Sequence, residues 1–486
     1  MWADARECVS AHDEIDCMYA RNEGLKHTET VKSKTFLYRE IAAPVIIGVF
    51  FCFLCFFFGV GQYPDSVTYI EAHLDREPVY PILLKGFRGL FGSGYPWATI
   101  IFQNMAAFLV TWYLHRYISR RFSLNGFFFW SALAVLLFPH IMSGVLAPSG
   151  IVLTNAILSE GITLILYQLF FTLVLKMWLE AKCMRYAVMA WIVAFVTTLA
   201  RGQMLPMLLA WMLFTIIVVC KKARCGTWKA VGAIVVLILT LGAFVGRGVI
   251  IGAYTETVYG VSGGNTGGNM TLLTNVLYSA DEADVERVAG QLDKGEGMLL
   301  EQLYTQAREQ GLTYTSAENG LFARIGHHED SHDRMKFGIL YEMMERYVKE
   351  EHPKADPAQI RVMMDELAGG FMRPLVMENI GGFLLTYLYV ICGGFIRTVA
   401  ILHPILAVYA LLIYIVAIVL MWYLFRRKRS SEAAVMMAMV LIMIAANVCA
   451  TGLTIMCLSR YMIYNMAIFY VAGLVLLQKI WDLYKK

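Results

Sequence analysis

The sequence predicts an all-α polytopic membrane protein. Of its 486 residues, 58% are hydrophobic and only 16% are charged, which excludes an ordinary soluble globular domain. Apolar runs long enough to cross about 30 Å of hydrocarbon recur along the chain, and basic residues cluster on alternate connections between them. We therefore expect about ten transmembrane helices, or eleven if one shorter apolar stretch also crosses the membrane.

The ten long apolar runs lie at 41–60, 97–115, 127–146, 153–177, 186–200, 204–220, 229–251, 401–425, 433–457 and 461–481. The shorter stretch, 380–398, contains two Gly-Gly pairs. If it crossed the membrane, the basic run 426–429 would lie outside, whereas a re-entrant or interfacial segment keeps that run inside with the other basic loops. We favour the second arrangement, which places both termini in the cytoplasm.

This topology divides the chain into four parts. We expect a cytoplasmic N-terminal segment at 1–40, a membrane module at 41–252 that includes an outer loop at 61–96, an extracytoplasmic helical cap at 253–379, and a second membrane module at 380–486. The cap contains no cysteine and so no disulfide framework, which favours a bacterial plasma membrane. The net charge of +4 is too small to indicate a nucleic-acid partner.

The outer loop 61–96 has the pattern of two short helices at the membrane surface. In the second, Leu83, Phe87 and Leu90 share one face, as in a helix that lies at the level of the lipid headgroups. Asp65 follows the first span directly, where a carboxylate sits at the water boundary. From position alone, Asp65 is either a general base or an ordinary aspartate that caps a helix beginning at Ser66.

The order of residues in this loop resembles the first outer loop of the GT-C glycosyltransferases. The resemblance rests on Asp65, on the run Arg-Glu-Pro-Val-Tyr-Pro-Ile-Leu-Leu at 76–84, and on Leu-Phe-Gly at 90–92. Within that superfamily, the chain is most similar to the dolichyl-phosphate-mannose protein mannosyltransferases and the bacterial aminoarabinose transferases. It departs from them by Glu77 in place of a proline and by Ser66 in place of a second acidic residue. The resemblance implies that Asp65 is the catalytic base.

Arginines at the outer ends of the spans are candidates for binding a lipid phosphate, because a guanidinium keeps its charge and offers paired donors. We assign this role to Arg460, Arg201 and Arg247 with Tyr461; the alternative is simple snorkelling at helix ends. The pair Arg460-Tyr461 also resembles an Arg-Tyr pair near the end of many GT-C chains. Candidates for binding the sugar or acceptor are Glu160, Arg76, Tyr80, Glu71 and His73. For Glu160, an ion pair with an outer arginine is an equal alternative.

Two features of the cap carry weaker predictions. His328 and His332 stand four residues apart in the polar run 327–333, which we interpret as a solvated turn rather than a metal site, since no complete ligand set is evident. The glycine-rich stretch 260–270 lacks the Lys-Ser/Thr of a phosphate loop, and we expect a flexible linker there.

Together these features predict a membrane glycosyltransferase. It would move a sugar from a polyprenyl-phosphate-linked donor to an acceptor hydroxyl on a glycan, a lipid or a protein, at the extracytoplasmic face and with inversion. The scheme needs no cofactor, and the sequence leaves the use of a divalent metal open. The alternatives are a lipid-linked glycan polymerase or ligase, a polytopic transporter, and a non-catalytic assembly subunit.

Overall fold

The computed structural model describes residues 38–146, 150, 152–222, 226–261, 266–427 and 431–485. The described part is helical, and eleven of its helical segments are long and apolar enough to cross a membrane. They are a first helix at Tyr38–Phe58, a segment Val79–Arg121 that contains α4 (Tyr95–Arg121), α5 (Gly126–Leu146), α6 (Ser159–Leu179), α7 (Cys183–Ala200), α8 (Pro206–Lys222), α9 (Gly226–Tyr259), α16 (Ile380–Val399), α17 (Pro404–Arg427), α18 (Glu432–Thr454), and a last segment, Ser459–Tyr484, formed by α19 (Ser459–Met462) and α20 (Met466–Tyr484). The prediction of an all-α polytopic membrane protein is thus confirmed, while the predicted segment 1–40 lies almost wholly outside the described residues.

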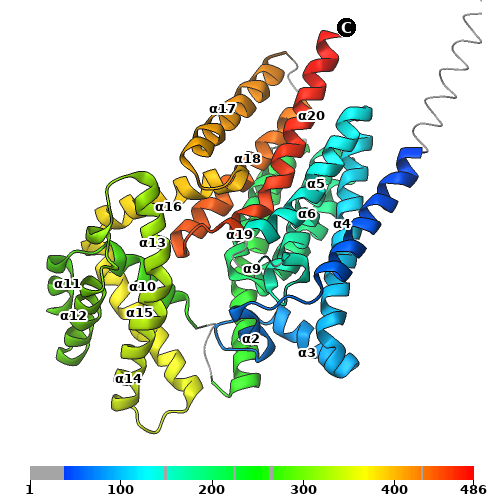
Figure 1. Cartoon of the computed structure of the whole chain (residues 1–486). Helices are drawn as coiled ribbons and strands as arrows, with labels where there is room; N and C mark the ends of the chain where they lie inside the picture. Colours follow the sequence, from blue (N-terminus) through cyan, green and yellow to red (C-terminus); the bar gives the residue numbers. More distant parts are fainter. Residues whose placement is uncertain are drawn as a thin grey trace, which may run out of the picture.

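One end of the helix bundle, which we call the terminal face, gathers both described ends of the chain. Glu40, near the start of the first helix, pairs with Arg120 at 2.7 Å, and Gln478 near the end of α20 donates to the carbonyl of Ser123 at 3.0 Å. The opposite end of the bundle, which we call the site face, carries α2 and α3 (Figure 1). Both described chain ends therefore lie on the same side of the bundle.

Helix α16 is the segment predicted not to cross. At its start Asn379 donates to Ser279 of the cap at 3.3 Å, and near its end Arg397 donates to the carbonyl of Cys457, just before α19, at 3.0 Å. Its two ends thus lie on the cap side of the bundle although its length would suffice for a span. This placement is the one expected of an interfacial helix.

The loop after the first helix folds into the two short helices expected there, α2 (Pro64–Ile70) and α3 (Val79–Phe91). Proline occupies the first turn of α2, where a missing N–H costs nothing, and the Ser66 hydroxyl accepts a hydrogen bond from the backbone N–H of Tyr63 at 2.9 Å. In α3, Tyr80 and Leu84 are buried whereas Leu90 is 78% exposed. Such an apolar outer surface suits a helix at the membrane boundary.

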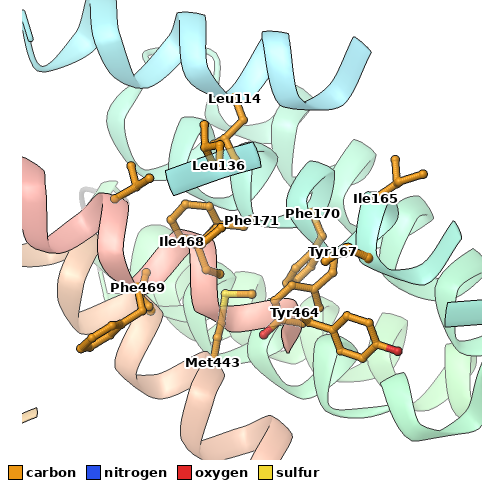
Figure 2. Packing of buried hydrophobic residues seen from close by; sticks show 14 of the residues in the cluster. Leu114, Leu136, Ile165, Tyr167, Phe170, Phe171, Met443, Tyr464, Ile468 and Phe469 are labelled. Carbon is orange, nitrogen blue, oxygen red and sulfur yellow. The ribbon is translucent and has the colours of Figure 1, made fainter. Parts of the chain in front are cut away.

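The bundle packs around α6, which is buried along nearly its whole length. Phe170 and Phe171 of α6 lie close to Tyr464 and Ile468 of the last segment, and Figure 2 shows how these side chains fill the space between the two. A helix that is apolar all round belongs inside a bundle rather than at the lipid surface. This core fixes the outer ends of α6 and of the last segment relative to each other.

The cap is helical, as predicted, and has its own core. Its helices are α10 (Gly268–Ser279), α11 (Glu282–Ala289), α12 (Lys294–Glu309), α13 (Leu321–Met335), a π-helical turn at Lys336–Leu340, α14 (Tyr341–Glu351) and α15 (Pro357–Glu378). Buried side chains such as Leu277, Leu303 and Phe371 hold them together. Helix α9 continues to Tyr259, past residue 253, where the cap was predicted to begin.

The prediction of a solvated turn at 327–333 is wrong. These residues form part of α13, where His328 and His332 are each only 2% exposed and His328 contacts Asn275 at 3.1 Å. The helix packs them inward because it lies against α10 and α16. Of the glycine-rich stretch 260–270, residues 262–265 lie outside the described residues, and α10 begins at Gly268.

Candidate functional site

Asp65 lies in the first turn of α2 at the site face, and its carboxylate is engaged by two arginines. One oxygen lies 3.1 Å from Nη2 of Arg76 and the other 3.4 Å from Nη1 of Arg460. The position before the helix, which a capping residue would occupy, belongs to Tyr63. Asp65 is therefore not the N-cap residue of α2, and its side chain keeps 39% of its surface exposed.

Arg76 is held in place by groups from α2. Its Nε donates to the hydroxyl of Thr68 at 2.8 Å, and its guanidinium lies 4.5 Å from the ring centroid of Tyr69. The Tyr69 hydroxyl in turn lies 2.8 Å from that of Ser159, and burial raises the pKa of Tyr69 to about 12. Tyr69 is thus a neutral hydroxyl at neutral pH, beside a fixed positive charge.

Glu160 and Arg201 form a buried ion pair behind this layer. Oε2 of Glu160 lies 2.9 Å from Nη1 of Arg201, and Oε1 lies 3.9 Å from Nε of Arg460. Glu160 is only 2% exposed. Of the two predictions for Glu160, the ion pair with an outer arginine is confirmed; a role in binding sugar stays a prediction. Asp65, Arg460, Glu160 and Arg201 form a chain of alternating charges, as buried charges require partners.

Tyr461 joins the two arginines of this chain. The guanidinium groups of Arg201 and Arg460 lie 4.8 and 4.9 Å from its ring centroid, and its hydroxyl accepts a hydrogen bond from Arg460 at 2.7 Å. Cation–π contacts of this kind hold a guanidinium without neutralising it. Tyr461 therefore fixes the positions of both guanidinium groups, while their charges are balanced by Glu160 and Asp65.

Arg247 is placed by a second carboxylate, Glu77. Nη2 of Arg247 lies 3.4 Å from Oε1 of Glu77, and the same oxygen accepts a hydrogen bond from the backbone N–H of Gly202 at 2.7 Å. Glu77 is one of the two residues that depart from the glycosyltransferase pattern. Here it connects the outer loop to the turn between α7 and α8 and to α9.

A cleft of about 650 Å³ opens between the bundle and the cap. Its charged lining residues are Asp75, Arg76, Glu77, Arg201, Arg247 and Lys336. Asp65, Glu160 and Arg460 are not among its lining residues, but each contacts one that is: Asp65 contacts Arg76, Glu160 contacts Arg201 and Arg460 contacts Tyr461. The volume is within the usual range for small-molecule sites. The lining thus carries four cations and two carboxylates, and Asp65 and Glu160 pair with two of these cations, Arg76 and Arg201, from outside the lining.

Lys336 and Asp75 line the cleft although neither was predicted from the sequence as a site residue. Lys336 stands in the π-helical turn of the cap, and its Nζ donates to the hydroxyl of Thr271 at 2.8 Å. Burial lowers the pKa of Lys336, and the charges of Asp75 and Asp333 oppose this effect. A π-helical turn is frequent at functional sites, but no local pattern reveals one from sequence.

Three of the candidate residues lie away from the cleft. Glu71 and His73 pair with each other at 3.0 Å and are exposed. Tyr80 is fully buried, and its hydroxyl donates to Oε1 of Gln103 at 3.0 Å. Tyr80 thus belongs to the packing between α3 and α4 rather than to the cleft surface.

Within the described residues, no group of three or more His, Cys, Asp or Glu side chains is arranged to hold a metal ion. No family model matches the chain, and neither a curated protein nor a solved structure with significant similarity was found. The resemblance to GT-C enzymes therefore rests on the residues of the loop 61–96 and on the pair Arg460-Tyr461.

Proposed function

We propose that the protein is a membrane glycosyltransferase that uses a polyprenyl-phosphate-linked sugar. The observation that carries the proposal is the half-exposed carboxylate of Asp65, held by Arg76 and Arg460 beside a cleft lined by cations. A carboxylate for the acceptor and fixed cations for a phosphate leaving group are the two requirements of this reaction. The resemblance of the outer loop to GT-C enzymes points to the same chemistry.

In the proposed reaction, Asp65 takes the proton of the acceptor hydroxyl while the oxygen attacks the anomeric carbon of the donor. The bond between that carbon and the phosphate oxygen breaks, and the polyprenyl phosphate leaves with the bonding electrons. Attack opposite the leaving group inverts the anomeric carbon. General-base catalysis of this kind contributes about 10²–10⁴-fold in rate.

The lining of the cleft suggests how the work is divided among the cations. Arg201, Arg247 and Lys336 face the cleft and would bind the departing phosphate. Arg460 contacts both Asp65 and Glu160 but does not line the cleft, so we assign it to positioning rather than to phosphate binding. Glu160, which is buried behind Arg201, fits the same positioning role.

The size of the cleft favours a single sugar phosphate over a whole glycan. At about 650 Å³ it accommodates a small-molecule headgroup. A polymerase or ligase would need room for several sugar units on the donor side. If the protein does not use simple donors, a polymerase or ligase is the expected alternative.

The deciding experiment measures transfer from a panel of radiolabelled polyprenyl-phosphate sugars by the purified full chain in detergent. Asp65→Asn removes the base without changing the side-chain size. Glu71→Gln is the matched control, because it makes the same carboxylate-to-amide change in the same loop at a side chain that is 62% exposed. We expect turnover by wild type and Glu71→Gln and a loss of at least about 100-fold in Asp65→Asn.

Equal turnover by Asp65→Asn and wild type would contradict the role of Asp65. If no monosaccharide donor is consumed but a lipid-linked oligosaccharide is, the protein is a glycan polymerase or ligase.

A further inference from the structure

A second cavity, of about 420 Å³, lies at the terminal face, on the side of the bundle opposite the cleft. It is built where α4 and α6 end, and its lining includes Tyr113, Arg116, Tyr117, Lys176 and Glu180. We call it the terminal pocket. Nothing in the proposed glycosyl transfer uses it.

Lys176 carries the charge that distinguishes this pocket. Its Nζ lies 5.0, 4.9 and 4.7 Å from the ring centroids of Tyr113, Tyr117 and Tyr186. Within the described residues no carboxylate forms an ion pair with it. The tyrosine rings hold the ammonium in place by cation–π attraction and leave its charge uncompensated.

The arginines on the other wall each contact a carboxylate. Arg116 and Arg120 both contact Glu40, at 3.1 and 2.7 Å. Arg121 pairs with Glu432, and the carboxylate of Glu180 accepts a hydrogen bond from Tyr117 at 3.1 Å. Among the described residues, the ammonium of Lys176 is thus the charge of the pocket that an anionic ligand would neutralise.

The surroundings of the pocket are those of a lipid rather than of a soluble anion. Arg116 lies over the ring of Trp112 and Lys221 over that of Trp178, as in the aromatic belt at a membrane boundary. One turn deeper along the bundle, Leu109 of α4 and Val188 of α7 are 49% and 54% exposed. A phosphate in the pocket would therefore have an apolar surface beside it for acyl chains.

We propose that the terminal pocket binds the phosphate headgroup of an anionic phospholipid, with Lys176 and the α4 arginines as its cationic contacts. Basic pockets between transmembrane helices are suited to lipid phosphates. Because the pocket shares no residue with the cleft, this assignment is independent of the proposed transferase activity.

The test counts lipids bound to the purified full chain by native mass spectrometry after exchange into micelles with phosphatidylglycerol or phosphatidylcholine. Thermal unfolding is followed in the same mixtures. We expect phosphatidylglycerol, and not phosphatidylcholine, to remain bound and to raise the Tm. In Lys176→Gln the affinity should fall about fivefold, whereas Lys176→Arg retains the charge and should retain binding.

Arg426→Gln is the matched control. Arg426 is exposed at the terminal end of α17 and lies 4.8 Å from the ring centroid of Trp422, but it does not line the pocket. The Arg426→Gln protein should bind phosphatidylglycerol with the same affinity as wild type. If Lys176→Gln does not fold, Arg116→Gln provides the same test from the opposite wall of the pocket.

Three results would overturn the proposal. These are equal retention of phosphatidylglycerol and phosphatidylcholine by wild type, equal loss of phosphatidylglycerol in Arg426→Gln and Lys176→Gln, and full displacement of the lipid by millimolar inorganic phosphate. The last result would identify a free phosphate as the occupant.

Discussion

The carboxylate of Asp65 lies 3.4 Å from the guanidinium of Arg460, although 395 positions separate the two residues in the chain. The contact joins the loop after the first span to the start of the last span. Arg460 extends it to Glu160, 3.9 Å away at the start of α6. Three distant segments of the chain thus meet in one charged network, and its buried members should be sensitive to the loss of any partner.

Glu160→Gln should destabilise the protein. The substitution leaves the guanidinium of Arg201, which is only 13% exposed, without its carboxylate. Removing one member of a buried ion pair typically costs about 3 kcal/mol, because the remaining charge is left without compensation. The measurement is the free energy of unfolding in detergent.

A double-mutant cycle supplies the control for Glu160. If the loss comes from the stranded charge, Glu160→Gln combined with Arg201→Met should be more stable than the sum of the two single changes implies. Strict additivity would mean that the two side chains do not interact energetically, and would speak against the pair seen at 2.9 Å.

Gly202→Ala should disturb the cleft, whereas Gly248→Ala should leave it unchanged. A Cβ at Gly202 would overlap the carboxylate of Glu77, whereas a Cβ at Gly248 meets no atom within 4 Å. Displacing Glu77 breaks its bond to the N–H of Gly202 and withdraws the partner of Arg247. We expect a loss of about 2 kcal/mol in unfolding free energy for Gly202→Ala. Gly248 lies in α9 and also lines the cleft, so unchanged or raised stability in Gly248→Ala is the matched result.

Tyr80→Phe should lower stability without lowering turnover. The change removes one hydrogen bond to Gln103 inside a fully packed site, at a cost of about 1 kcal/mol. Tyr80 does not line the cleft, so donor turnover per folded molecule should be unchanged. A tenfold loss of turnover at unchanged Tm would instead return Tyr80 to the substrate-binding residues.

The sequence was sufficient for features that hydropathy and charge determine. Helices α2 and α3, the helical cap and the placement of Arg201 and Arg460 at the same end of the bundle follow from periodicity and from the ends of apolar runs. Contacts across long separations do not follow. Lys336 reaches the cleft because a π-helical turn and the packing of the cap aim it there, and neither leaves a local pattern. His328 was misassigned for a related reason, since a polar run does not show which of its faces the tertiary structure buries.

Lys336 should also make stability depend on pH. Burial lowers its pKa in the folded protein, so between that lowered value and the ordinary lysine value of about 10.4 the unfolded chain binds more protons than the folded one. The free energy of unfolding must therefore rise with pH across that window. Below the window Lys336 is charged in both states, so the cost of burying its charge does not change with pH. We expect the Tm of wild type to rise relative to that of Lys336→Met as the pH is raised from 7 towards about 10.4. Lys349→Met, at an exposed lysine of the cap, should show no such divergence. A Tm difference between wild type and Lys336→Met that stays constant over this range would show that Lys336 titrates like a solvent-exposed lysine.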